Sequence, residues 1–183
     1  MNCSGYFKQQ RKLKLFLLAF LLLLLLLSMV RCAYGPVFYS NTTDSAPRGL
    51  YLVVPWQTME YGDYVIAALP EDVPALHVEQ GFLLLKQVQG LPGDIYTVYS
   101  NALAIRDESY VIHHLPGLPQ LETGRQVIPE DEVLLLNPVG ISFDSRYLGP
   151  IGMQQIKCRV ILILPYAVLD ELKERLVKIN ETR

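Results

Sequence analysis

The segment Leu83-Leu-Leu-Lys-Gln-Val-Gln-Gly-Leu-Pro-Gly-Asp94 places one lysine in a leucine-rich strand that runs into a turn. Side chains alternate along a strand, so Lys86 shares a face with three apolar side chains, those of Phe82, Leu84 and Val88. A buried charge is costly, so such a lysine either reaches solvent along its apolar stem or loses its proton. The segment therefore predicts a β-strand that carries an amine on its apolar face.

Short apolar runs separated by Gly, Pro, Asn and Asp continue from Gly35 onward, a pattern typical of a mainly β domain. Ser100-Asn101 and the stretch from Gly90 to Asp94 have the composition of turns. Strands are predicted at residues 49–54, 64–68, 82–88, 95–99, 102–105, 133–136 and 160–164.

Two later segments differ from this pattern. Residues 107–132 are polar and rich in Pro and Gly, and they predict a long loop or a small insertion over one side of the sheet. Residues 167–179 have leucines at helical spacing, which predicts a C-terminal helix packed on its own domain. Binding of a partner or of a membrane surface is the alternative role for this helix.

An apolar run at residues 15–30, interrupted only by Ser28, predicts a membrane anchor. As a helix the run would be roughly 24 Å long, slightly short of a hydrocarbon core. A cleavable signal peptide is the alternative, but cleavage after Ala33 would put Arg31 where a small residue is needed. We therefore expect an uncleaved transmembrane helix at residues 15–31.

Charge predicts the orientation of this anchor. Residues 1–14 carry +4 with no acidic residue, and the remainder carries −6 to give the net charge of −2. A basic flank stays in the cytoplasm, so residues 36–183 are expected to form an exported domain. That domain is mildly acidic and lacks the basic patch that is typical of nucleic-acid binding.

The sequence predicts no metal or cofactor. The chain has no Cys-His pattern of a structural zinc site, and adjacent histidines such as His113 and His114 point apart in a strand. Cys32 and Cys158 would share a compartment that permits disulfides, and the sequence leaves their pairing open, with free thiols favoured.

The stretch Asn41-Thr-Thr-Asp-Ser-Ala-Pro-Arg-Gly-Leu-Tyr51 places Ser45 in a polar turn. A serine hydroxyl is a poor nucleophile until a base removes its proton, and a neutral lysine can be that base. Desolvation lowers the pKa of an amine, and three leucines precede Lys86. Ser45 and Lys86 together predict a membrane-bound serine peptidase.

Several segments resemble sequence boxes of the type I signal peptidases. Residues 86–94 resemble their Lys-Arg-x-x-Gly-Leu-Pro-Gly-Asp box, and residues 142–151 resemble Ser-x-Asp-Ser-Arg-Tyr-x-Gly, with residues 127–136 similar to the strand before it. Ordinary leader peptidases have Ser-Met-x-Pro-Thr at the nucleophile, whereas this chain has Ser45-Ala-Pro-Arg-Gly. That box is similar to the conjugative-transfer peptidases of the TraF group. The stretch Asn137-Pro-Val-Gly140 also lacks the Gly-Asp-Asn-Arg-Asp run of leader peptidases, which again favours the TraF group.

The resemblance implies a role for each matching residue. Ser45 would attack the scissile carbonyl, and Lys86 would take its proton and later protonate the leaving amine. Thr43 and the backbone N–H of Ser45 would support the oxyanion.

The same resemblance assigns the last box to support of the lysine. Ser142 would orient Lys86, while Asp144 and Arg146 would form an ion pair that holds the box against the lysine strand. The implied fold is a mainly β signal-peptidase core with one N-terminal transmembrane helix and one C-terminal helix.

The implied function is processing of a membrane-embedded precursor, a conjugative pilin, on the periplasmic side of a bacterial inner membrane. The substrate would pair as an added strand near residues 49–54 and 82–86, with a small residue before the cut. Water or an amine that joins peptide ends would capture the acyl-enzyme, and the sequence leaves this choice open. The alternatives are a general signal peptidase and a non-catalytic anchored subunit of the transfer apparatus.

Overall fold

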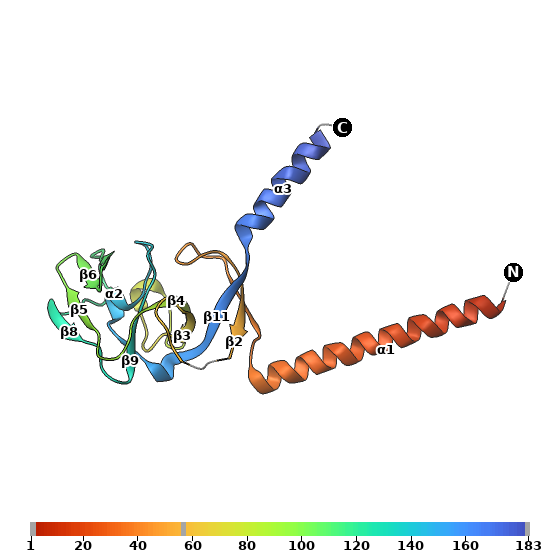
Figure 1. The fold of residues 1–183 in the computed structure, drawn as a ribbon, viewed down its shortest axis with the longest axis horizontal. Helices are drawn as coiled ribbons and strands as arrows, with labels where there is room; N and C mark the ends of the chain where they lie inside the picture. The colour runs from red at the N-terminus through yellow and green to blue at the C-terminus, as the bar shows by residue number, and fades with distance from the viewer. Residues whose placement is uncertain (1–2, 56–57, 182–183) are drawn as a thin grey trace. The chain divides into compact units, whose positions relative to one another are not determined.

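The computed structural model describes residues 3–55 and 58–181 and divides into two units, which meet between Val37 and Phe38. The first unit contains the helix α1 (Cys3–Tyr34), shown in Figure 1, which includes the apolar run of residues 15–30. Over the described residues, no helix combines the length and the apolar character needed to cross a membrane.

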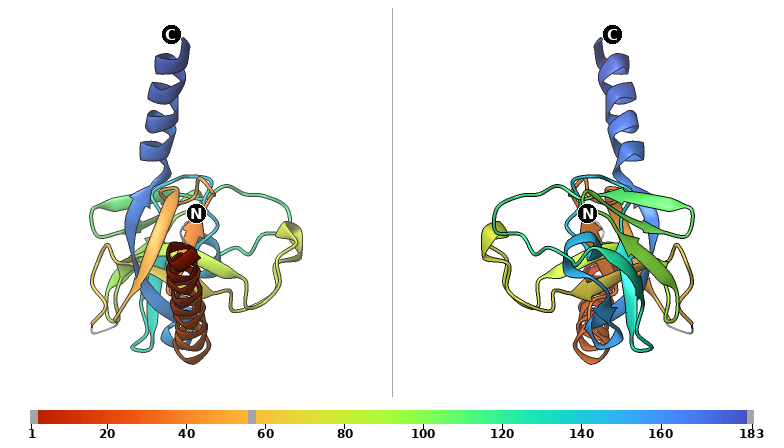
Figure 2. Two further views of the ribbon diagram at one scale, coloured as in Figure 1. Left: turned by 90° about the vertical axis from the view of Figure 1, so that its right-hand side faces the viewer. Right: turned by 90° about the vertical axis from the view of Figure 1, so that its left-hand side faces the viewer.

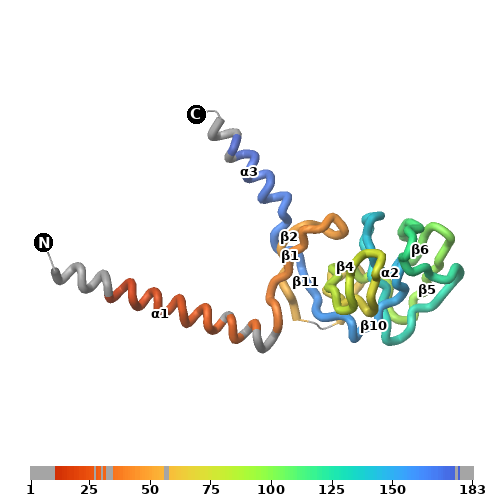
Figure 3. The backbone as a smooth tube through the Cα atoms, turned by 180° about the vertical axis from the view of Figure 1, so that it is seen from behind, coloured from red at the N-terminus to blue at the C-terminus, as the bar shows by residue number. Residues whose placement is uncertain are grey.

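The second unit is built on an antiparallel sheet with the strand order β1-β2-β11-β3-β4-β9-β10. Its strands are β1 (Phe38–Asn41), β2 (Gly49–Val54), β3 (Tyr64–Ala68), β4 (Leu83–Gly90), β9 (Glu132–Leu136), β10 (Ile151–Gly152) and β11 (Ile156–Pro165). Strand β11 lies between β2 and β3. It therefore connects β2, the strand that follows the Ser45 turn, to the rest of the sheet. Figure 3 traces this path of the chain.

A smaller antiparallel sheet has the order β7-β6-β5-β8. It consists of β5 (Ile95–Val98), β6 (Ala102–Ile105), β7 (Glu108–Val111) and β8 (Gly124–Val127). Short helical turns complete the unit: η1 (Pro74–Leu76), α2 (Ser145–Leu148) and η2 (Met153–Gln155).

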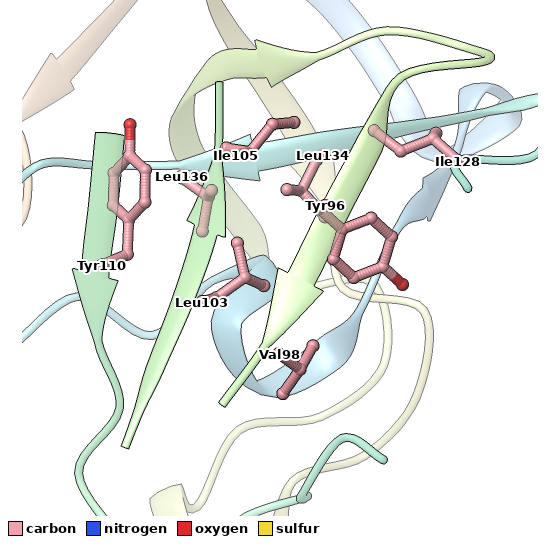
Figure 4. Packing of buried hydrophobic residues seen from close by; sticks show 8 residues of the cluster. All are labelled: Tyr96, Val98, Leu103, Ile105, Tyr110, Ile128, Leu134 and Leu136. Carbon is pink, nitrogen blue, oxygen red and sulfur yellow. The ribbon is translucent and has the colours of Figure 1, made fainter. Parts of the chain in front are cut away.

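Strand β9 joins the cores of the two sheets. Its side chains at Leu134 and Leu136 belong to the cluster of the smaller sheet, which Figure 4 shows. Its alternate side chains, Val133 and Leu135, belong to a cluster in the larger sheet. Both faces of β9 are therefore buried, which explains its continuous apolar sequence.

Every strand predicted from the sequence is present, with ends within a few residues of the prediction, as is the turn at Ser100-Asn101. Four strands were missed: β1, β7, β8 and β10. The prediction of a loop or small insertion at residues 107–132 was therefore wrong in part, because this segment contains β7 and β8. Each of these has at most one inward side chain, Tyr110 in β7 and Gln126 in β8, so no apolar alternation was visible.

The predicted C-terminal helix is α3 (Tyr166–Glu181). Its first residue is fixed to the domain, since the Tyr166 N–H donates to the Arg48 carbonyl oxygen at 3.0 Å. Val168 and Leu172 remain 45% and 50% exposed, and Figure 2 shows α3 extending away from the sheets. Of the residues that predicted packing on the domain, Leu169 is half-buried and Leu172 is exposed, so the expectation was wrong at Leu172, while the side chains of Leu176 and Ile179 lie outside the described set.

Candidate active site

Lys86 is buried, with only 3% of its surface exposed. Alternation in β4 directs Leu84, Lys86 and Val88 to one face, as predicted, whereas Phe82 precedes the strand and is exposed. The Lys86 Nζ donates a hydrogen bond to Ser142 Oγ at 2.7 Å. The amine therefore ends at a neighbouring hydroxyl and does not reach solvent along its stem.

This burial changes the acidity of the amine. Desolvation lowers the pKa of Lys86 from 10.5 to about 8, with the Asp144 carboxylate opposing the shift and the Arg146 guanidinium adding to it. At pH 7 about a tenth of such amines is neutral, several hundredfold more than for an ordinary lysine. Lys86 thus has the acid–base character that a lysine base requires.

Ser45 lies in the turn between β1 and β2, which is organised by the buried Asn41. The Asn41 amide Nδ2 donates to the carbonyl oxygens of Thr43 at 3.0 Å, Ala46 at 3.0 Å and Pro47 at 3.2 Å. Its Oδ1 accepts from the backbone N–H and the hydroxyl of Thr43. One asparagine at the end of β1 therefore holds the turn on both sides of Ser45.

The hydroxyl of Ser45 lies 3.1 Å from Thr43 Oγ1. Thr43 already donates its hydroxyl proton to Asn41, so Ser45 is the donor in this arrangement. The hydroxyl contacts thus join Ser45 to Thr43 and Lys86 to Ser142. Among the hydrogen bonds of the described residues, none joins Ser45 directly to Lys86.

Ser45 and Lys86 nevertheless line the same cavity, which has a volume of 430 Å³. Its other walls come from β1 and its following turn, from β3 and β4, and from the segment before α2: Tyr39, Ser40, Asn41, Thr42, Thr43, Ile66, Phe82, Leu83, Leu84, Leu85, Ile141 and Phe143. The lining is largely apolar, and the Ser45 hydroxyl and the Lys86 amine are among its polar groups.

The edge of β4 along this cavity is open to another strand. Strand β9 pairs with β4 only from Gln87 onward, so among the described residues no strand pairs with residues 83–85 on that side, where the Leu85 carbonyl oxygen accepts from the Asn137 amide. At the other predicted substrate edge, residues 49–54 pair with β11 on one side, and residues 49–52 pair with β1 on the other. The prediction was therefore wrong for residues 49–52, because the missed strand β1 occupies that part of the edge.

Asp144 and Arg146 form a buried ion pair, each with 1% of its surface exposed. The Arg146 Nε donates to Asp144 Oδ1 at 2.8 Å and Nη2 donates to Oδ2 at 3.0 Å. Arg146 also donates to the carbonyl oxygens of Asn137 at 2.6 Å and of Val111 at 3.1 Å. The pair thus connects the segment around Ser142 to the end of β9 and to the smaller sheet.

Asn137 is a site residue that the sequence interpretation missed. It is fully buried directly after β9, where its Oδ1 accepts from the Gln87 N–H at 3.1 Å and its Nδ2 donates to the Leu85 carbonyl oxygen at 3.1 Å. These two backbone groups flank Lys86. The Asn137 side-chain amide therefore continues the hydrogen-bond ladder between β4 and β9 beyond the last residue of β9. An asparagine that follows a buried apolar run was the available signal.

The two adjacent histidines lie apart from this cavity lining, and both are exposed. Within the described part of the chain, no group of His, Cys, Asp and Glu side chains is placed to hold a metal ion. Cys158 carries a free thiol.

Residues 10–165, which include every residue of this candidate site, match the family described as signal peptidase, peptidase S26. The chain therefore belongs to the peptidase S26 family of signal peptidases.

Among its relatives, a plasmid transfer protein TraF from Escherichia coli is 31% identical, with 64% of this chain and 76% of the relative covered. A probable conjugal transfer protein TraF from Sinorhizobium fredii is 29% identical, with 80% of this chain and 90% of the relative covered. A solved structure of a signal peptidase I from Enterococcus faecalis is 17% identical, with a TM-score of 0.37 over 57% of this chain and 97% of that one.

Proposed function

We propose that this chain is a membrane-anchored serine endopeptidase in which Ser45 is the nucleophile and Lys86 the general base. The observation that carries the proposal is that a serine in a turn and a buried lysine line the same 430 Å³ cavity. Membership of the signal peptidase family supports the same chemistry.

Lys86 acts in its neutral form. One N–H of the amine donates to Ser142, which leaves the lone pair of the neutral amine free to accept a proton. After rotation away from Thr43, the Ser45 hydroxyl donates to that lone pair. Ser45 Oγ then attacks the scissile carbonyl carbon while Lys86 takes the proton.

The oxyanion that forms needs hydrogen-bond donors. The backbone N–H of Ser45 is one, and the Thr43 hydroxyl becomes another once its proton turns from Asn41 toward the cavity. Collapse of the tetrahedral intermediate breaks the C–N bond, and protonated Lys86 gives its proton to the leaving amine. The acyl-enzyme is then captured by water or by an incoming amine.

The proposed substrate is an exported precursor held near the membrane, and specifically a conjugative pilin precursor. The names of the TraF relatives connect this group with plasmid transfer. We propose that residues 15–31 anchor the chain in a bacterial inner membrane with its second unit in the periplasm, as the basic N-terminal flank favours. The substrate would pair with the open edge of β4 at residues 83–85.

The test is co-expression of the intact chain with the candidate pilin precursor, followed by mass spectrometry of the pilin. We expect the wild type to shorten the pilin and the Ser45→Ala variant to leave it intact. Ser109→Ala is the matched control, since Ser109 is an exposed serine on β7.

The mass also identifies the capturing group. Loss of a peptide alone indicates hydrolysis, and a further loss of one water indicates joining of the peptide ends. An unchanged pilin in all strains would contradict this substrate. Rescue of cells depleted of their own signal peptidase would then favour a general signal peptidase, and failure to rescue would favour a non-catalytic subunit.

A further inference from the structure

Ser45 lies on the wall of a second cavity, of 540 Å³. This cavity is lined by the Ser45 turn, the segment after β9 and the start of α3: Asp44, Ala46, Pro47, Arg48, Tyr64, Pro138, Val139, Pro165, Tyr166, Ala167 and Asp170. Among the described residues, Ser45 is the only one that lines both cavities. Ser45 therefore lies at the boundary between the two cavities.

A peptide that is cut at Ser45 must extend in both directions from the scissile bond. The 430 Å³ cavity contains Lys86 and the open edge of β4, so it suits the part that precedes the cut. We infer that the 540 Å³ cavity binds the substrate segment that follows the cut. This inference rests on the proposed role of Ser45.

The walls of the cavity indicate which segment it takes. Half of the twelve lining residues are prolines, alanines and a valine, Tyr64 and Tyr166 add two aromatic residues, and the charged residues Asp44, Arg48 and Asp170 make up most of the remainder. Burial of apolar side chains against such walls is favourable. The site therefore selects an apolar side chain shortly after the cut.

Hydrogen bonds fix the walls of the cavity relative to Ser45. The Tyr166 N–H donates to the Arg48 carbonyl oxygen at 3.0 Å, and the Tyr166 hydroxyl lies 2.6 Å from Ser40 Oγ. The Tyr51 hydroxyl donates to the Pro47 carbonyl oxygen at 2.7 Å. The first turn of α3 is thereby fixed to the Ser45 turn, so the two walls of the cavity keep their spacing.

The test compares two substrates of the intact chain in detergent. One is a peptide that spans the cut mapped by mass spectrometry, with leucine as the second residue after it. The other is the methyl ester of the residues before the cut, which leaves only methanol. The variant is Ala167→Trp, which adds an indole to the cavity wall from the exposed first turn of α3.

We expect Ala167→Trp to raise the ratio of the peptide KM to the ester KM about tenfold. Contacts in a pocket commonly discriminate between substrates by a factor of this size. Val168→Trp is the matched control, since Val168 is the next residue on α3, is 45% exposed and is absent from the cavity wall. It should leave the ratio of the two KM values unchanged.

Ser45-dependent cleavage of both substrates with no change in that ratio for Ala167→Trp would overturn the inference and leave the proposed function standing. Equal ratios of the peptide and ester KM values for the Ala167→Trp and Val168→Trp variants would also overturn the inference. Absence of Ser45-dependent cleavage of either substrate by the wild type would refute the proposed function, and the inference with it.

Discussion

Replacement of Lys86 by methionine removes a buried amine and keeps most of the side-chain volume, so its effect on stability should depend on pH. In the unfolded chain this lysine titrates near 10.5, and in the folded chain burial lowers its pKa to about 8. Between these values the unfolded chain binds one proton more than the folded chain, so the stability of the wild type rises with pH. The difference of the two pKa values corresponds to about 3 kcal/mol.

The assay is urea unfolding of the intact wild type and the Lys86→Met variant from about pH 7 to about pH 10. The free energy of unfolding of the wild type should rise by up to about 3 kcal/mol relative to the variant, with nearly all of the gain above pH 8. Titration of the tyrosines cancels, because both proteins contain them. The loss of the bond to Ser142 adds an offset of about 1–3 kcal/mol that is the same at every pH, so only the slope is informative.

Lys157→Met is the matched control for this slope, since Lys157 is an exposed lysine on β11. Its difference from the wild type should be flat over the same range. A flat difference for Lys86→Met would refute the argument, because it would mean that the buried amine titrates as it does in the unfolded chain.

Further predictions concern activity and packing. The rate of cleavage, measured as kcat/KM, should rise about tenfold per pH unit below about pH 8 and level off above it, because only neutral Lys86 accepts a proton. Asn137→Ala removes the amide that bridges the backbone on both sides of Lys86. This variant should lower kcat about tenfold with little change in KM. It should also move the midpoint of the pH–rate profile upward. Gly49→Ala should lower the free energy of unfolding by about 1–3 kcal/mol in urea, since its Cβ would lie 2.5 Å from a backbone carbonyl oxygen of β11.

Each of these predictions has a control or a contradicting result. A flat rate between about pH 6 and pH 8 would exclude Lys86 as the titrating base. Asn101→Ala, in the exposed turn between β5 and β6, should leave the pH–rate profile unchanged, and an unmoved midpoint for Asn137→Ala would argue against its positioning role. Gly140→Ala should cost little, since the nearest atom to its Cβ would be 3.6 Å away, and equal stability losses at both glycines would contradict the close approach of β2 and β11.

The sequence around Lys86 predicted the strand and the face of the amine, because alternation in a strand depends only on residues two positions apart. The same pattern could not decide between burial and a path to solvent. That decision depends on Ser142, which is 56 positions away in the sequence and receives the hydrogen bond of the amine. Asn137 was missed for a related reason, since a single polar residue after a strand is typical of a turn.

Short, half-exposed elements were the weakest part of the sequence interpretation. Strands β1, β7, β8 and β10 contain between two and four residues, and few of their side chains are buried. Their pairing is fixed by backbone hydrogen bonds to neighbouring strands, which any side chain permits. The periodicity of α3 correctly predicted a helix, but not that Val168 and Leu172 stay exposed, because an apolar stripe does not specify what covers it.

The sequence by itself determined the mainly β class, the longer strands, the C-terminal helix and the residues that resemble the signal peptidase boxes. Only the tertiary structure decided that β11 lies between β2 and β3, that Ser45 and Lys86 line one cavity, and that a second cavity meets Ser45 on its other side. The physical reason is the range of the interactions. Strand and helix patterns follow from neighbours in the sequence, whereas strand order, cavities and the acidity of a buried amine depend on groups that folding brings together from distant positions.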